Sequence, residues 1–196
     1  MAKRFYPVLR DEGFKGSGTR LLRIAEPLVH VVNVQGRAGI DGCFINLGAN
    51  LTFLWPVVAK NTLSGDCAFH ARLDPPKDSL PKCWDYGVTE SDAHAVIDTL
   101  IEHWESDGRA FFDRYATYPD SFERLIRETE FRGMHPYRVL THAKIARELG
   151  QEELARRLVR DALPDVGEGA PVLLRKMQDF LDSTDGGTLE SDAAPV

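Results

Sequence analysis

Four carboxamide side chains stand at alternating positions in two neighbouring apolar segments. They are Asn33, Gln35, Asn46 and Asn50. A carboxamide offers both a hydrogen-bond donor and an acceptor, which suits recognition of a polar ligand or of a partner's backbone. Arg37, in the loop between the two segments, adds a cationic donor. These five residues are the candidate binding site, and the sequence indicates no catalytic residue.

The segments 28–35 and 43–54 have the composition of two β-strands joined by a Gly-containing loop. Successive side chains of a strand point to opposite faces. If the more apolar sets share a core face, even-numbered residues of the first strand pair with odd-numbered residues of the second. All four carboxamides then share the other face, which is either a binding surface or a solvated or covered face with locally satisfied amides. His30 falls in the apolar set, so we expect it at the core edge with a satisfied ring nitrogen.

The elements that must position these residues fall into a strand-rich first half and a helical second half. We expect a short helix at 3–12 and strands at 19–25, 28–35, 43–54 and 67–73. Apolar spacing and capping residues then predict helices from Thr89 (with Gly108 ending or kinking that helix), from Asp120, and over 136–149, 151–163 and 171–181. The fold class is α+β, with an N-terminal antiparallel sheet of three to four strands after a short leading helix.

The Pro-rich stretch 74–81 places a boundary near residue 88. We expect a sheet-containing lobe at 1–88, a helical lobe at 89–182 packed on it as one compact unit, and a disordered acidic tail at 183–196. With 196 residues the chain is long enough to bury a core without disulfides. Three scattered cysteines and the absence of a membrane-length apolar run favour a cytoplasmic protein.

The net charge of −6 is unevenly distributed. Residues 1–88 carry 11 basic against 8 acidic residues, residues 89–182 carry 13 against 19, and residues 183–196 carry none against 3. A dedicated nucleic-acid binder normally has a basic excess that neutralises phosphates. Nucleic-acid binding is therefore disfavoured, and the acidic surplus of the second half suits a basic protein partner.

The motifs of several chemical sites are either absent from the sequence or lack the required spacing. Cys43, Cys67, His70 and Cys83 lack the paired Cys-x-x-Cys halves of a structural zinc site, and a strand at 67–73 would place Cys67 and His70 on opposite faces. Phosphate-binding and nucleophile motifs are absent, and the Gly-rich 13–18 is expected to be a flexible turn. Residues 144–160 resemble a helix-turn-helix, but the acidic turn favours an ordinary helical hairpin. We expect no metal and no cofactor.

Four short motifs carry a resemblance to a known family. They are GFKGSG (13–18), VVNVQ (31–35), CFINLG (43–48) and CAFHARL (67–73), followed by Trp84. Over residues 9–86 the chain resembles the bacterial family catalogued as domain of unknown function 4304. That family has no established activity, so the resemblance implies a fold grouping and assigns no catalytic residue.

The leading hypothesis is a non-enzymatic binding or interaction module that engages a protein partner. One version is an immunity or antagonist protein whose acidic surface complements a basic toxin such as a nuclease. The alternative is a small-ligand-binding protein or enzyme with a polar pocket on the sheet face, where Arg37, Asn33 and Asn46 orient a polar or anionic ligand. The sequence does not determine the oligomeric state.

Overall fold

The computed structural model describes all residues of the chain except 2, 55–62, 79–81 and 184–196. The expected acidic tail therefore lies outside the described residues, apart from Ser183. The chain forms two compact units, Met1–Tyr118 and a second that begins at Pro119. The boundary expected near residue 88 lies inside the first unit, because the helix that follows it contributes Ile97, Leu100 and Trp104 to the core of the sheet.

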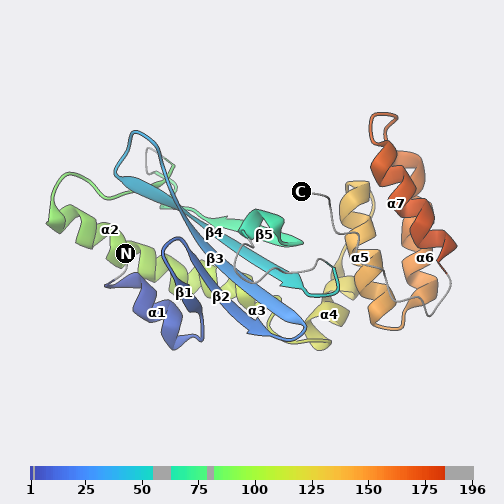
Figure 1. The fold of residues 1–196 in the computed structure, drawn as a ribbon, viewed down its shortest axis with the longest axis horizontal. Coiled ribbons are helices and arrows are strands. Elements are labelled where there is room, and N and C mark those ends of the chain that lie inside the picture. Colours follow the sequence, from blue (N-terminus) through green and yellow to red (C-terminus); the bar gives the residue numbers. More distant parts are fainter. Residues whose placement is uncertain (2, 55–62, 79–81, 184–196) are drawn as a thin grey trace. The chain divides into compact units, whose positions relative to one another are not determined.

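The first unit is an antiparallel sheet with helices before and after it (Figure 1). Its elements are α1 (Phe5–Asp11), β1 (Lys15–Ser17), β2 (Arg20–Ala25), β3 (Leu28–Gly36), β4 (Gly42–Leu51), the short 3-10 helix η1 (Ser64–Asp66), β5 (Phe69–Leu73), β6 (Trp84–Asp85), α2 (Glu90–His103), the π-helix η2 (Trp104–Gly108) and α3 (Arg109–Asp113). The α+β class with a leading helix is confirmed. Among the described residues the sheet has six strands rather than three to four. The sequence did not predict β1 and β6, because they are too short to show a periodic pattern.

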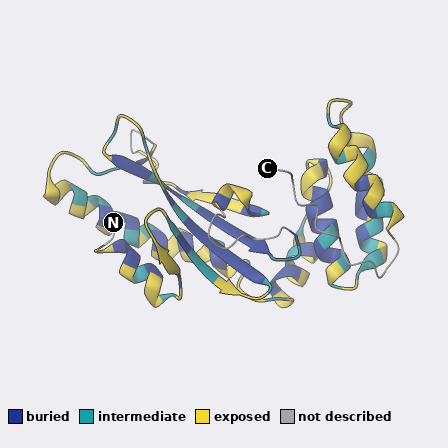
Figure 2. Ribbon diagram, viewed as in Figure 1, coloured by how far each residue is buried: buried dark blue, intermediate teal, exposed yellow. Residues whose placement is uncertain are grey.

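The strands follow the order β1-β2-β3-β4-β5, and β6 also pairs with β4. In the central hairpin His30 pairs with Ala49 and Val32 with Leu47. Even-numbered residues of β3 therefore face odd-numbered residues of β4, as predicted. β3 and β4 are the most buried strands, whereas β1 is exposed along its length (Figure 2).

One face of the sheet packs against the helices of its own unit. Its apolar side chains, among them Val32 and Leu47, form a single core with residues of α1, α2 and α3. Trp104 is fully buried there, with its ring centroid 5.7 Å from that of Phe5 and 5.8 Å from that of Phe112. The sequence led us to expect that Gly108 would end or kink this helix; the helix does not end there but continues from α2 into α3 through the π-helix η2. A Cβ at Gly108 would lie 2.7 Å from the Trp104 ring, so a glycine is needed there.

His30 is buried at the edge of this core, as predicted, with both ring nitrogens engaged. Arg23 donates to Nδ1 through Nε at 3.2 Å and through Nη2 at 2.9 Å. Because arginine can only donate, Nδ1 is the acceptor and Nε2–H donates to the Tyr115 carbonyl at 3.0 Å. Burial, with the Arg23 charge beside it, lowers the pKa of His30 to about 4, so the ring is neutral at pH 7.

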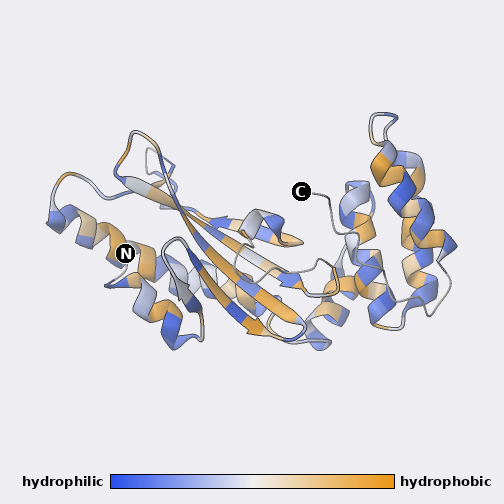
Figure 3. Cartoon of the chain, viewed as in Figure 1, coloured by the Kyte–Doolittle hydropathy of each residue, from blue (hydrophilic) through white to orange (hydrophobic). Residues whose placement is uncertain are grey.

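The described residues of the second unit form helices joined by turns and loops, with no strand among them. It contains α4 (Asp120–Glu128), α5 (Pro136–Glu148), α6 (Glu152–Ala162), the 3-10 helix η3 (Leu163–Asp165) and α7 (Pro171–Asp182). Pro136 occupies the first turn of α5, and Gly150, with φ of +74°, ends it. Apolar and hydrophilic segments alternate along α6 and α7 (Figure 3). No helix in the described part of the chain is long and apolar enough to cross a membrane.

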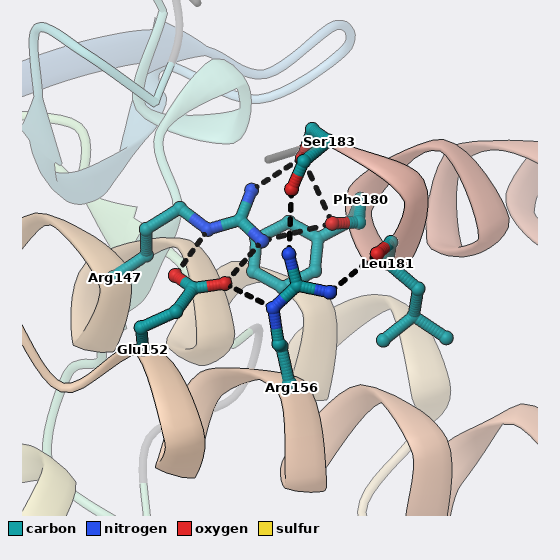
Figure 4. Close-up of polar contacts among 6 residues, drawn as sticks. All are labelled: Arg147, Glu152, Arg156, Phe180, Leu181 and Ser183. Carbon is teal, nitrogen blue, oxygen red and sulfur yellow. Dashed lines mark hydrogen bonds and ion pairs between the residues drawn. The ribbon is translucent and has the colours of Figure 1, made fainter. Parts of the chain in front are cut away.

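Three charged residues join the α5–α6 turn to the end of α7 (Figure 4). Glu152 accepts from Arg147 Nε at 2.8 Å and from Arg156 Nε at 2.6 Å. Arg147 also donates to the Phe180 carbonyl at 2.8 Å, and Arg156 donates to the Ser183 carbonyl at 2.7 Å. The two guanidinium groups thus bind carbonyls at the C-terminal end of α7, where a helix has unpaired acceptors and a partial negative charge.

Replacing Glu152 with glutamine should therefore destabilise the second unit by about 1 kcal/mol, because two half-buried arginines lose their shared counter-ion. Glu153→Gln is a matched control, since Glu153 is also in the first turn of α6 but is exposed. Far-UV circular dichroism reports on both units, because both contain helices. Tryptophan fluorescence reports on the first unit alone, because all three tryptophans lie before residue 119. An equal effect of the two substitutions on the circular dichroism transition would contradict the role of the network.

Candidate functional site

The face of the sheet opposite the helices carries the carboxamides. We call it the amide face and define it by Asn33, Gln35, Asn46 and Asn50, whose positions alternate with the core residues of β3 and β4. Asn33 lies directly across from Asn46. The register extends this row to Arg20 on β2, which is opposite Asn33, and to Arg72 on β5, which is opposite Asn46. The predicted gathering of the amides is therefore present, and a cationic residue stands at each side of the pair.

A short turn covers part of the amide face. It consists of η1 and the residues that follow it, and its Ser64 and Cys67 lie against Gly48 of β4. A Cβ at Gly48 would be 2.7 Å from the Cys67 sulfur and 2.9 Å from the Ser64 Cα, so a larger residue would displace the turn. Asp66 stabilises the turn, because its Oδ2 accepts from the Leu63 N–H at 2.8 Å.

The turn and the strands enclose an open pocket of about 570 Å³. Its strand walls are Asn33, Gln35, Asn46, His70, Ala71 and Arg72. The turn residues 63–66 and Asp74 complete the lining. A pocket of this size is within the range of small-molecule sites, and the converging polar side chains can fix the orientation of a ligand.

Asn46 is the hydrogen-bonding centre of this pocket. Its Oδ1 accepts from Arg72 Nε at 3.3 Å, and its Nδ2 donates to Gln35 Oε1 at 3.2 Å. Asn33 Nδ2 donates to the Thr19 carbonyl at 2.9 Å. The side chains of Asn33 and Asn46 are only partly exposed, so both are held in place while part of each faces the pocket.

Two predicted site residues have other surroundings. Asn50 is on the amide face but only 1% exposed, and its Oδ1 accepts from the Ala68 N–H at 3.3 Å. It holds the end of the covering turn, so we leave it out of the proposed binding surface. Arg37 does not line the pocket: its guanidinium lies 5.9 Å from the Phe44 ring centroid, and Nη1 donates to the Cys83 sulfur at 3.4 Å.

The cysteines are buried as free thiols. Cys67 and His70 lie on the same face rather than on opposite faces, because the strand begins only at Phe69 and Cys67 belongs to the turn. Burial raises the pKa of Cys67 to about 12, so the thiol is protonated at neutral pH and is a poor nucleophile. In the described ranges no three His, Cys, Asp or Glu residues are grouped to hold a metal ion.

The pocket contains residues that the sequence interpretation did not select. His70 and Arg72 alternate with Phe69 and Leu73 of β5, and the same parity argument, carried one strand further, would have placed them beside Asn46. Residues 63–66 have no periodic pattern from which their position over the sheet could be predicted.

The model of a family described as a domain of unknown function, DUF4304, matches residues 5–114. The match covers more than half of the chain. The chain belongs to the DUF4304 family. The match runs from the start of α1 to just beyond α3, so the DUF4304 region includes the whole sheet, the amide face and the helices that complete the core. The resemblance noted over residues 9–86 is thereby confirmed, and its description assigns no activity.

No curated protein and no solved structure matches the chain.

Proposed function

We propose that the protein is a binding module whose amide face receives a polar ligand. The observation that carries this proposal is the pocket of about 570 Å³ in which Asn33, Gln35 and Asn46 meet Arg72 and His70. The helices of the unit pack on the opposite face, so Asn33, Gln35 and Asn46 are not buried in the core. This is the small-ligand alternative of the sequence interpretation, and no catalytic group is part of it. The buried free thiols support a cytoplasmic location.

The test is a thermal-shift screen of polar metabolites against the protein and an Asn33→Ala/Asn46→Ala double variant. Each lost hydrogen bond weakens binding by about 1 kcal/mol, so the double variant should bind a stabilising compound about 10- to 100-fold more weakly. Gln178→Ala, an exposed carboxamide on α7, is the matched control and should bind as the wild type does. Equal stabilisation of the double variant and the wild type would contradict the proposal.

The second candidate function is binding of a protein partner at an acidic surface. That surface belongs to a shorter segment than the whole helical half considered in the sequence analysis. Residues 89–118 carry seven acidic and two basic residues, whereas residues 119–182 carry twelve and eleven. The acidity expected of the whole helical half is thus concentrated on α2, η2 and α3, and all seven acidic side chains there are exposed. This charge supports a basic partner, as in the immunity-protein hypothesis. A Glu102→Lys/Glu105→Lys variant that kept its affinity for such a partner would contradict this candidate.

A further inference from the structure

Hydrogen bonds in the pocket form a chain whose direction is fixed by chemistry. Arg72 Nε donates to Asn46, and Asn46 donates to Gln35. Because a guanidinium group has only N–H donors, the Asn46 oxygen must face Arg72 and its amino group must face Gln35. The Gln35 oxygen is then the acceptor, and the chain ends on the Gln35 Nε2 amino group. The pocket therefore presents a donor at that end.

The guanidinium of Arg72 is held but not neutralised. Its Cζ lies 4.3 Å from the Phe44 ring centroid, a cation–π contact that supports the group from one side. In the described part of the chain no carboxylate forms an ion pair with it. Two carboxylates, Asp66 and Asp74, line the same pocket, but neither forms an ion pair with Arg72, and Asp66 accepts from the Leu63 N–H. The terminal nitrogens of Arg72 thus offer a charged, two-pronged donor in a prepared position.

Asn33 presents the opposite polarity. Its Nδ2 is used in the bond to the Thr19 carbonyl, so its Oδ1 is the atom that remains to accept from a ligand. The pocket therefore combines the Arg72 fork and the Gln35 amino group, both donors, with one acceptor on β3.

From this arrangement we propose that the ligand of the amide face carries an anionic group, a carboxylate or a phosphate, which binds the Arg72 guanidinium and the Gln35 amino group. A donor elsewhere on the ligand binds Asn33 Oδ1. This inference rests on the proposed function and adds the chemical class of the ligand. A carboxylate and a phosphate each present two oxygens that the arginine fork can bind. The geometry of the pocket therefore does not distinguish the two groups, and an experiment is needed to do so.

The test titrates the full chain with inorganic phosphate and, separately, with succinate, at constant ionic strength, and follows the melting temperature by tryptophan fluorescence. At least one anion should stabilise the protein, and Arg72→Gln should weaken its apparent affinity about tenfold or more. Arg72→Lys, which keeps the charge but loses the fork, should bind with intermediate affinity. Stabilisation by phosphate alone assigns a phosphoryl group, and stabilisation by succinate alone assigns a carboxylate.

Arg20→Gln is the matched control, because Arg20 is on the same face but does not line the pocket. It should bind the anion as the wild type does, and equal losses in Arg20→Gln and Arg72→Gln would overturn the inference by showing only a general charge effect. Binding of neither anion would also overturn it. If a neutral polar compound such as glucose then bound in a manner that required Asn33 and Asn46, the proposed function would stand without the anionic ligand.

Discussion

Replacing Gly48 with alanine should lower the free energy of unfolding of the first unit by about 2 kcal/mol. The added methyl group would lie 2.7 Å from the Cys67 sulfur and 2.9 Å from the Ser64 Cα. The second of these atoms is backbone, so the whole turn over the amide face must move, and overpacking of this kind costs about 1–3 kcal/mol. Urea denaturation followed by tryptophan fluorescence measures the loss.

The control for this substitution is Gly36→Ala in the same hairpin. A Cβ at Gly36 meets nothing within 4 Å, and this glycine has no positive φ. We expect Gly36→Ala to change stability by less than about 0.5 kcal/mol, as is usual for surface substitutions. Equal stability of the two variants would show that the close contact between Gly48 and the covering turn is not a feature of the protein in solution.

Stability of the first unit should fall by about 3 kcal/mol as the pH decreases from 6.5 to 4. The pKa of His30 is about 4 in the folded protein and 6.5 when unperturbed. Above pH 6.5 the ring is mainly neutral in both the folded and the unfolded state, so its titration does not lower the free energy of unfolding there. Between these values the unfolded chain binds a proton that the folded chain excludes, and the difference favours unfolding. Below about pH 4 both states are protonated and the loss reaches its limit.

A His30→Gln variant isolates this contribution. Glutamine can donate to the Tyr115 carbonyl and accept from Arg23, as His30 does, but it does not titrate. The buried His142 of the second unit also has a lowered pKa, so the comparison uses tryptophan fluorescence, which reports on the first unit. A pH dependence in His30→Gln as steep as in the wild type would contradict the assignment to His30.

The sheet was predictable where strands are long enough to show alternation. The nine residues of β3 and the ten of β4 have two distinct faces, and matching their apolar sets gave the observed pairing. The capping pair of Thr89 and Asp92 likewise marked the start of α2. Alternation has no meaning in the three residues of β1 or the two of β6, so both were missed.

Two features could not be predicted from the sequence because they depend on tertiary contacts. They are the continuation of the helix through Gly108 and the absence of a unit boundary near residue 88. Glycine usually weakens a helix, but here it is needed because the Trp104 ring occupies the space of a side chain. The Pro-rich stretch before residue 88 connects β5 to β6 of the same sheet, and the helix after it still completes the core. Composition alone does not distinguish such a connection from a boundary between units.

The candidate site was predicted in part. Parity assigned Asn33, Gln35 and Asn46 to one face, where the structure also places them. It could not show that Asn50 is buried, because that depends on a turn from residues 63–68 packing over the sheet. Arg72 lies on β5, 26 positions after Asn46 in the sequence. Its place in the site depends on the pairing of β4 with β5, which brings it beside Asn46.

The most direct test of the amide face as the binding site is a two-dimensional ¹H–¹⁵N NMR titration with inorganic phosphate and with succinate. The signals to follow are those of the side-chain amides of Asn33, Gln35 and Asn46 and of the Arg72 Nε–H. We predict that these signals shift in a saturable manner with one of the two anions, while those of Gln178 and of the α2 backbone do not. Saturable shifts confined to other parts of the chain, with the amide-face signals unchanged, would contradict the account.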